Sequence, residues 1–279
     1  MTVIVADSAG LGHVIRCVAL SEHLPYPVLY TPEPVPFAVP VETRTWDQLD
    51  NLVDTDLAIV DTYRKRDQLI NSLRPKCRHL CAIVDDSAHS FQVDSLVSPH
   101  VNTETLAYHI PGKTYAGANY ALVRPGIRRL RTRVARLLVC LGSGAPPPNL
   151  ERDVRAAVLG TDIKVYVYGG PLDVMRSYPR VKPGYYSQLP DAMHSADLAI
   201  TPASMTMLEL LSCGVPCLTY AVNDHQRKLQ HISPCAQYNS VTDIVMAING
   251  DVKSMSQAAL DLVDGRGCER VGALLRFDG

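Results

Sequence analysis

The sequence has no surplus of charge of either sign, few aromatic residues and no long apolar run. Its 279 residues contain 27 Lys and Arg against 28 Asp and Glu, which gives a net charge of −1. A chain without a basic surplus does not favour a polyanionic partner, so we expect no binding to nucleic acid. No stretch approaches the ~18 uncharged apolar residues of a membrane-spanning helix, so we expect no membrane span.

The sequence also gives no sign of secretion or of a structural metal. Its first residues carry neither the basic nor the apolar segment of a secretory signal. The eight cysteines are scattered, and the two closest pairs, Cys77/Cys81 and Cys213/Cys217, have CxxxC spacing rather than the CxxC of a zinc site. Several lie in apolar runs, where a thiol behaves as a small apolar side chain. We therefore expect reduced core thiols, no metal and a cytoplasmic protein.

Short apolar strands alternate with helix-length segments along the chain. This pattern favours βαβ units and a parallel sheet. Strands are expected at residues 3–6, 25–30, 57–60, 81–84, 137–141, 164–168, 198–200 and 216–220, and a first helix at about residues 13–23. A basic segment with Pro and Gly separates two such sets, and this composition is typical of a solvated linker. The sequence predicts an α/β protein of two Rossmann-like domains, residues 1–130 and 131–279, that face each other across a ligand-binding cleft.

A glycine turn follows the first strand and opens the first helix. Glycines there allow a ligand to approach the backbone closely. A dinucleotide-binding GxGxxG pattern needs a third glycine where this chain has Ile15, so we expect no dinucleotide cofactor. His13 stands at the start of the helix. It is either a helix-terminal residue with its hydrogen bonds satisfied or a reactive imidazole suited to be a general base near neutral pH.

A second polar segment follows the predicted strand at residues 198–200. Thr206 and Glu209 are three residues apart, which places them on one face of the following helix. One interpretation of Glu209 is structural: a glutamate near a helix N-terminus interacts favourably with the helix dipole. The functional alternative is a carboxylate that accepts hydrogen bonds from ribose hydroxyls, with a phosphate at the helix N-terminus.

The chain resembles GT-B nucleotide-sugar enzymes, and most closely the UDP-sugar hydrolase family of pseudaminic acid biosynthesis. The resemblance lies in segments that follow the same order over nearly the whole chain. These segments are residues 10–20, 59–63, 83–86, 115–125, 141–144, 196–200, 206–209 and 264–271.

The resemblance implies an enzyme that releases UDP from a UDP-linked amino, deoxy sugar, with water attacking the anomeric carbon and inverting it. His13 and Tyr63 are then the catalytic candidates: His13 activates water and Tyr63 lines the sugar pocket. Glu209 holds the ribose, with Thr206 and Ser204 near the diphosphate. The other implied substrate-binding residues are Gly10, Gly12, Arg16, Asp61, Asp86, Gly142, Asn223 and Gln226. No cofactor or metal is implied, and the adjacent Asp85 and Asp86 are expected to cap a helix or orient His13 rather than bind a metal.

Two segments depart from the hydrolase pattern. Residues 202–205 read Pro-Ala-Ser-Met where the family has a glycine-serine loop, and residues 223–226 resemble the peptidoglycan N-acetylglucosaminyltransferase family instead. Two alternatives therefore stand beside hydrolysis. One is a GT-B glycosyltransferase with a small-molecule or lipid acceptor, and the other is a UDP-sugar-binding protein without catalysis. By resemblance, the C-terminal helix is expected to pack back on the N-terminal domain, and the basic segment after Arg124 to be a solvated strap rather than an acceptor contact.

Overall fold

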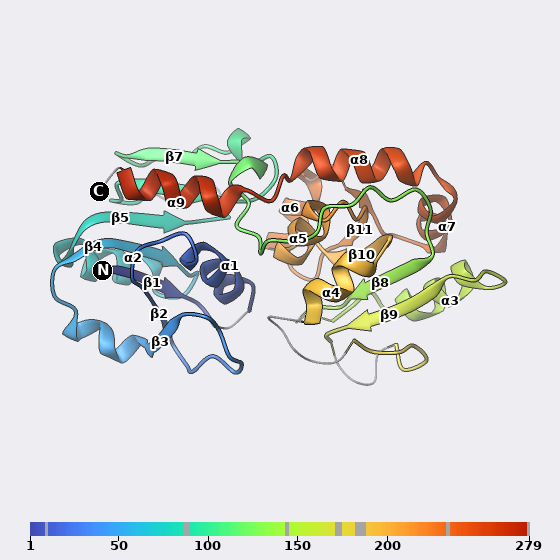
Figure 1. Cartoon of the computed structure of the whole chain (residues 1–279), viewed down its shortest axis with the longest axis horizontal. Helices are drawn as coiled ribbons and strands as arrows, with labels where there is room; N and C mark the ends of the chain where they lie inside the picture. Colours follow the sequence, from blue (N-terminus) through green and yellow to red (C-terminus); the bar gives the residue numbers. More distant parts are fainter. Residues whose placement is uncertain are drawn as a thin grey trace. The chain divides into compact units, whose positions relative to one another are not determined.

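The chain forms two compact units, shown in Figure 1 as a computed structural model. The structure describes residues 1–8, 11–85, 90–142, 145–170, 175–181, 188–232 and 235–277. The first unit comprises Met1–Pro125 together with Gly265–Gly279, and the second comprises Gly126–Asp264. Within the described residues, no helix has both the length and the apolarity needed to cross a membrane.

A seven-stranded parallel sheet forms the centre of the first unit, in the order β3-β2-β1-β4-β5-β6-β7. Its central strands are almost wholly buried, as expected of a parallel sheet covered on both faces. The order reverses between β1 and β4, which makes this the point where the loops on the two sides diverge and ligands collect. The strands are β1 (Thr2–Ala6), β2 (Pro27–Thr31), β3 (Glu42–Thr45), β4 (Thr55–Asp61), β5 (Cys77–Ile83), β6 (Ser95–Ser98) and β7 (Lys113–Ala116).

The helices of the first unit include one from the C-terminal end of the chain. They are α1 (Leu11–Ser21), α2 (Arg66–Leu73) and α9 (Gly267–Phe277), with the short 3₁₀ turns η1 (Trp46–Asn51), η2 (Arg74–Lys76), η3 (Thr103–Thr105) and η4 (Ala118–Tyr120). Helix α9 contacts α1 and η4. Arg270 Nη1 donates to the carbonyl of Asn119 at 3.0 Å. A Cβ at Gly267 would overlap the backbone of Ala121, so the start of α9 requires glycine to approach this closely.

The second unit contains a five-stranded parallel sheet in the order β12-β11-β10-β8-β9. Its reversal lies between β8 and β10, and its core is built from apolar residues such as Val139, Ile200 and Leu218. The strands are β8 (Arg136–Cys140), β9 (Lys164–Tyr168), β10 (Leu198–Pro202), β11 (Cys217–Tyr220) and β12 (Ala236–Gln237). The helices are α3 (Leu150–Val158), α4 (Gln188–Ser195), α5 (Met205–Ser212), α6 (Asp224–Ile232), α7 (Val241–Asn249) and α8 (Val252–Leu262).

Residues 125–130 of the basic segment before β8 are exposed, as expected of a solvated strap, but two arginines of the segment also bind helix ends in the second unit. The side chain of Arg131 is almost wholly buried, and Arg128 is its neighbour on the same segment. Their guanidiniums donate to backbone carbonyls at the C-terminal ends of α4, α5 and α8, namely those of His194, Ala196, Ser212, Cys213, Leu260 and Val263. Such carbonyls have no partner within their own helix and carry the negative end of its dipole. The arginines are therefore structural.

The predicted strands and the first predicted helix are all present, with ends shifted by a few residues. The structure adds β3, β6, β7 and β12, which were not expected. β3 reads Glu-Thr-Arg-Thr and lies partly exposed at a sheet edge, so it has no apolar alternation to reveal it. Six of the eight cysteines are buried, in agreement with the expectation of core thiols.

Candidate functional site

The reversal point of the first sheet brings the candidate catalytic residues together. β1 ends at Ala6 and leads to α1, while β4, its neighbour in the sheet, ends at Asp61. His13 lies in the first turn of α1, next to Gly12, and Asp61 reaches it across the gap between the two strand ends. Of the other predicted ligands in this unit, Gly10 and Asp86 lie outside the described residues.

His13 is hydrogen-bonded to a fully buried carboxylate. Its Nδ1 lies 2.7 Å from Oδ1 of Asp61, and the two side chains are 13% and 0% exposed. Because an ionised carboxylate only accepts, we assign the proton to Nδ1. Nε2 then carries the lone pair, and no described residue hydrogen-bonds to it. The arrangement is that of an imidazole oriented and polarised for proton acceptance.

Arg16 lies one turn beyond His13 on α1 and joins two carboxylates. Its Nε donates to Asp61 Oδ2 at 2.6 Å, and its Nη1 donates to both oxygens of Asp85 at 2.8 Å. The Arg16 side chain is 2% exposed. Both Arg16 and Asp61 were predicted to bind substrate, but each is buried and engaged with its neighbours. Their geometry is that of residues that position His13, and of the described carboxylates Asp61, not Asp85, is hydrogen-bonded to the imidazole.

The two carboxylates are held ionised. Burial by itself would raise the pKa of Asp61, but the charges and hydrogen bonds of Arg16 and His13 hold it well below the usual range. The pKa of Asp85 is also lowered, because Arg16 outweighs the effect of burial and the repulsion of Asp61. Two carboxylates and one guanidinium leave this cluster with one excess negative charge.

The ring of Tyr63 packs edge to face against the imidazole of His13. Its ring centroid is 4.9 Å from that of the imidazole, at an interplanar angle of 85°. Its hydroxyl donates to Asp85 Oδ2 at 3.0 Å, and the residue is 45% exposed. Burial of the hydroxyl and the charge of Asp85 raise the pKa of Tyr63 far above its usual range, so it is a neutral donor and not a base. The predicted role of Tyr63 in lining a sugar pocket stays a prediction.

Sequence reasoning missed a second ion pair at the same sheet edge. Asp7, which follows β1, is 2% exposed and accepts from Arg64 Nη2 at 2.7 Å and from Nε of the same residue at 3.0 Å. The Thr62 hydroxyl also donates to Asp7, at 3.1 Å. The guanidinium of Arg64 lies 5.9 Å from the ring centroid of Trp46. The available signal was that β1, like β4, runs directly into an aspartate.

The predicted nucleotide-binding residues gather at the reversal point of the second sheet. Gly142 follows β8 with a φ of +65°, and a Cβ there would lie 3.1 Å from the side chain of Pro202 at the end of β10. Ser204 is the N-cap of α5, and its side chain makes no capping hydrogen bond. Thr206 and Glu209 follow on α5, with Glu209 in its second turn and only 5% exposed. One helix therefore carries three of the predicted ligands.

Asn223 and Gln226 form a reciprocal cap at the start of α6. The Asn223 side chain accepts from the backbone of Gln226 at 2.8 Å, and the Gln226 side chain accepts from the backbone of Val222 at 3.1 Å. The first of these bonds is that of a capping box, and the second differs from it because the Gln226 side chain accepts from the residue before Asn223 rather than from Asn223 itself. The predicted role of these two residues in substrate binding stays a prediction, and the cap by itself accounts for the pattern.

The described residues contain no group of three or more His, Cys, Asp or Glu side chains placed to hold a metal ion. Asp61 and Asp85 are instead neutralised in part by Arg16.

Comparison with known proteins identifies the fold. No family model matches the chain, and no curated protein matches its sequence. MurG from Acinetobacter baumannii matches in structure with a TM-score of 0.66 at 11% identity, over 99% of both chains. A putative UDP-N-acetylglucosamine 2-epimerase from Listeria monocytogenes gives 0.63 at 11% identity, over 97% of this chain and 94% of that one. Anabaena HepE, solved with UDP and glucose, gives 0.59 at 11% identity, over 99% of both.

Identities this low show the fold alone. The two parallel α/β sheets and the match over nearly the full length of MurG and of a calicheamicin glycosyltransferase together show that the chain has the GT-B fold.

Proposed function

We propose that the chain is an enzyme that transfers a sugar from a UDP-sugar to an acceptor hydroxyl, with His13 as the general base. The observation that carries the proposal is the 2.7 Å contact between His13 Nδ1 and the buried Asp61 carboxylate at the reversal point of the first sheet. A histidine held in this way, in a cluster with one excess negative charge, can take a proton from a nucleophile and be stabilised as the imidazolium.

The reaction follows from these positions. The acceptor oxygen forms a bond to the anomeric carbon as its proton passes to Nε2 of His13. The bond from that carbon to the diphosphate oxygen breaks, and its electron pair leaves on UDP. Asp61 does not take the proton; it holds the imidazole and offsets the positive charge that forms. Arg16 and Asp85 fix Asp61 in turn, and the Tyr63 ring limits the space beside the imidazole.

The second unit provides the nucleotide side of the proposal. The N-terminus of α5 offers backbone N–H groups and the positive end of a helix dipole, which suit a diphosphate. Glu209 lies on the same helix, and in the proposal its carboxylate accepts hydrogen bonds from ribose hydroxyls. Gly142 follows β8, and in this proposal its lack of a side chain allows the phosphates to approach the backbone closely.

The similar structures support transfer more than hydrolysis. MurG, the calicheamicin glycosyltransferase CalG4 and a plant UGT2 solved with a fluorinated UDP-glucose share the fold. Hydrolysis of a UDP-linked amino, deoxy sugar is the second candidate, because the sequence segments follow the order of the hydrolase family across nearly the whole chain. Both reactions use the same base and the same leaving group, and differ only in whether the nucleophile is water.

The test is UDP release from a panel of UDP-amino sugars in ¹⁸O-enriched water, with and without candidate acceptor alcohols. Release that requires an acceptor supports transfer. Release without an acceptor, with label in the sugar, supports hydrolysis. Tight UDP-sugar binding without turnover under any condition would instead indicate a binding protein and refute the enzymatic proposal.

Substitution of the base tests its role directly. His13→Ala should lower turnover by about 10²–10⁴, the usual contribution of a general base. His109→Ala is the matched control, because His109 is an exposed histidine of the same unit away from the cluster. Unchanged turnover in the His13 variant would remove the base from the proposal.

A further inference from the structure

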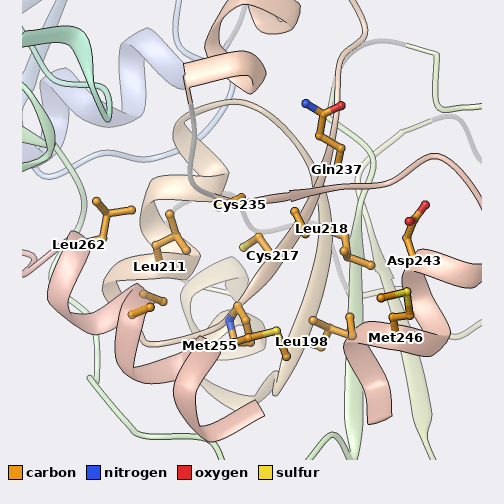
Figure 2. Close-up of a pocket in the computed structure, with 15 residues that line it drawn as sticks. Leu198, Leu211, Cys217, Leu218, Cys235, Gln237, Asp243, Met246, Met255 and Leu262 are labelled. Atoms are coloured by element: carbon orange, nitrogen blue, oxygen red, sulfur yellow. The ribbon is translucent and has the colours of Figure 1, made fainter. Parts of the chain in front are cut away.

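The second unit contains an apolar cavity of about 480 Å³ at the edge of its sheet where the strands begin. Figure 2 shows its walls, which come from the first residues of β10 and β11, from β12, and from α5, α7 and α8. Leu198 and Cys217 are the first residues of their strands, whereas Ser204 and Asn223 follow the opposite ends of the same strands. An occupant of this cavity would therefore not compete with a nucleotide bound at the other edge.

The cavity has an apolar lining and is large enough for a small-molecule ligand. Its volume falls within the roughly 300–1,000 Å³ of small-molecule sites. Leu211, Met246 and Leu262 line it together with two thiols, Cys217 and Cys235. These thiols are neighbours because the register pairs the residues that follow them, Leu218 and Ala236. Burial raises the pKa of Cys217 far above its usual range, so it stays a neutral thiol and acts as part of the apolar wall.

The charges around the cavity determine which polar group a bound apolar ligand could carry. Among the described residues that line it there is no Lys, Arg or His, and the one acid is Asp243. Asp243 already accepts hydrogen bonds from the backbone of Asn239 and Ser240, each at 2.8 Å. In Figure 2 the polar atoms of Asp243 and Gln237 point away from the apolar side chains. A carboxylate ligand would meet an acid with no cation to offset it, whereas a neutral hydroxyl or amide can hydrogen-bond to the Gln237 amide.

We infer that this cavity binds the alkyl chain of a neutral single-chain amphiphile, whose hydroxyl or amide head group lies at Gln237. The side chain of Met246 is 68% exposed at the rim, so the cavity opens to the surface through a flexible apolar residue. Methionine fits irregular chains well because it is unbranched and polarizable. The site is independent of the proposed sugar chemistry, so the failure of one does not imply the failure of the other.

The first test is calorimetric binding of 1-monododecanoylglycerol to the full chain, below the concentration at which the lipid aggregates. We expect one molecule per chain, bound at least about tenfold more tightly than dodecanoate. Ala258→Phe fills the cavity from an exposed position on α8, and Met246→Glu charges its rim. Each should weaken binding by at least about tenfold. Val245→Glu is the control, since Val245 is an exposed neighbour on α7 that does not line the cavity.

Three results would overturn the inference: no binding, tighter binding of dodecanoate, or full affinity in Ala258→Phe. Self-association of the chain that Met246→Glu abolishes, without lipid binding, would identify the surface as an interface between copies and would also overturn it. Alkylation provides a readout that needs no variant. Bound lipid should slow the reaction of Cys235 with N-ethylmaleimide, while Cys77, also partly exposed but in the first unit, reacts at its usual rate. Equal reaction of Cys235 with and without lipid would count against the site.

Discussion

Replacing Asp61 by Asn removes one charge from the cluster around His13 and almost no volume. In the unmodified chain the Asp61 oxygens accept from His13 Nδ1 and from Nε of Arg16. An amide retains only one accepting oxygen, so it cannot serve both donors equally. The substitution also makes the remaining pair of Arg16 and Asp85 neutral, which abolishes the excess negative charge beside the imidazole.

The magnitude follows from the distance. Two unit charges about 4 Å apart interact by about 4 kcal/mol at an effective permittivity of 20. If that interaction is made only when the imidazolium forms, its loss lowers turnover by about 10³, since each 1.36 kcal/mol corresponds to about a factor of ten. The expected result for Asp61→Asn is therefore a fall in kcat of about 10³ with UDP affinity unchanged, because the nucleotide residues lie in the other unit.

Asp85→Asn provides the matched control in the same assay. It deletes an equal charge from the same buried cluster, and Asp85 bonds to Arg16 and Tyr63 but makes no hydrogen bond to His13. Its effect on kcat should stay within about tenfold, because the Coulomb interaction weakens with distance. Equal losses in the two variants, or a loss below tenfold in a folded Asp61→Asn protein, would refute the proposed pairing of Asp61 with the base.

Three further predictions concern nucleotide binding and stability. Glu209→Ala should weaken UDP binding by about tenfold in calorimetry, from the loss of hydrogen bonds to a charged group, and unchanged affinity would exclude it from the ribose site. Arg131→Met should lower the unfolding free energy by about 1–3 kcal/mol in urea, from unsatisfied buried carbonyls, whereas the exposed Arg133→Met should change it by under about 0.5 kcal/mol. The folded pKa of Asp61 is lowered, so its stabilisation is complete above the unfolded value of about 3.9 and declines below it. Unfolding followed by Trp46 fluorescence, which reports on the first unit, should show that the free energy of unfolding falls with decreasing pH less steeply in Asp61→Asn. The difference in slope should reach up to about 1.4 kcal/mol per pH unit, and equal slopes would contradict this.

The sequence predicts the sheets well because their central strands are buried on both faces. Such strands are continuous apolar runs, and the eight that were expected are of this kind or nearly so. The strands that escaped prediction lie toward sheet edges or are very short. β12 has two residues, both exposed, and its sequence Ala-Gln carries no periodic signal. Only its pairing with β11 defines it as a strand.

The sequence could identify candidate residues of the site but not the role of each one. His13, Arg16, Asp61 and Tyr63 all stand out from the motifs, yet the motifs do not show which of them meets substrate. The structure adds the burial of each side chain, and burial depends on the partner that the side chain finds across the sheet. Arg16 meets Asp61 and Asp85, which are far from it along the chain, so its guanidinium is used before any ligand arrives.

The basic segment before β8 shows the same dependence on context. Its composition favours a solvated strap, since arginines are rarely buried without partners. The partners of Arg128 and Arg131 are the ends of three helices, whose last carbonyls leave hydrogen bonds unmade, while Arg129 pairs with Asp197. The sequence near an arginine does not show that its guanidinium will bind the carbonyls at the end of a helix. Arg131 and Cys213 are 82 positions apart along the chain. The guanidinium has several N–H donors and a permanent positive charge. It binds carboxylates at Arg16 and backbone carbonyls at Arg131. Only the fold determines which of these groups an arginine binds.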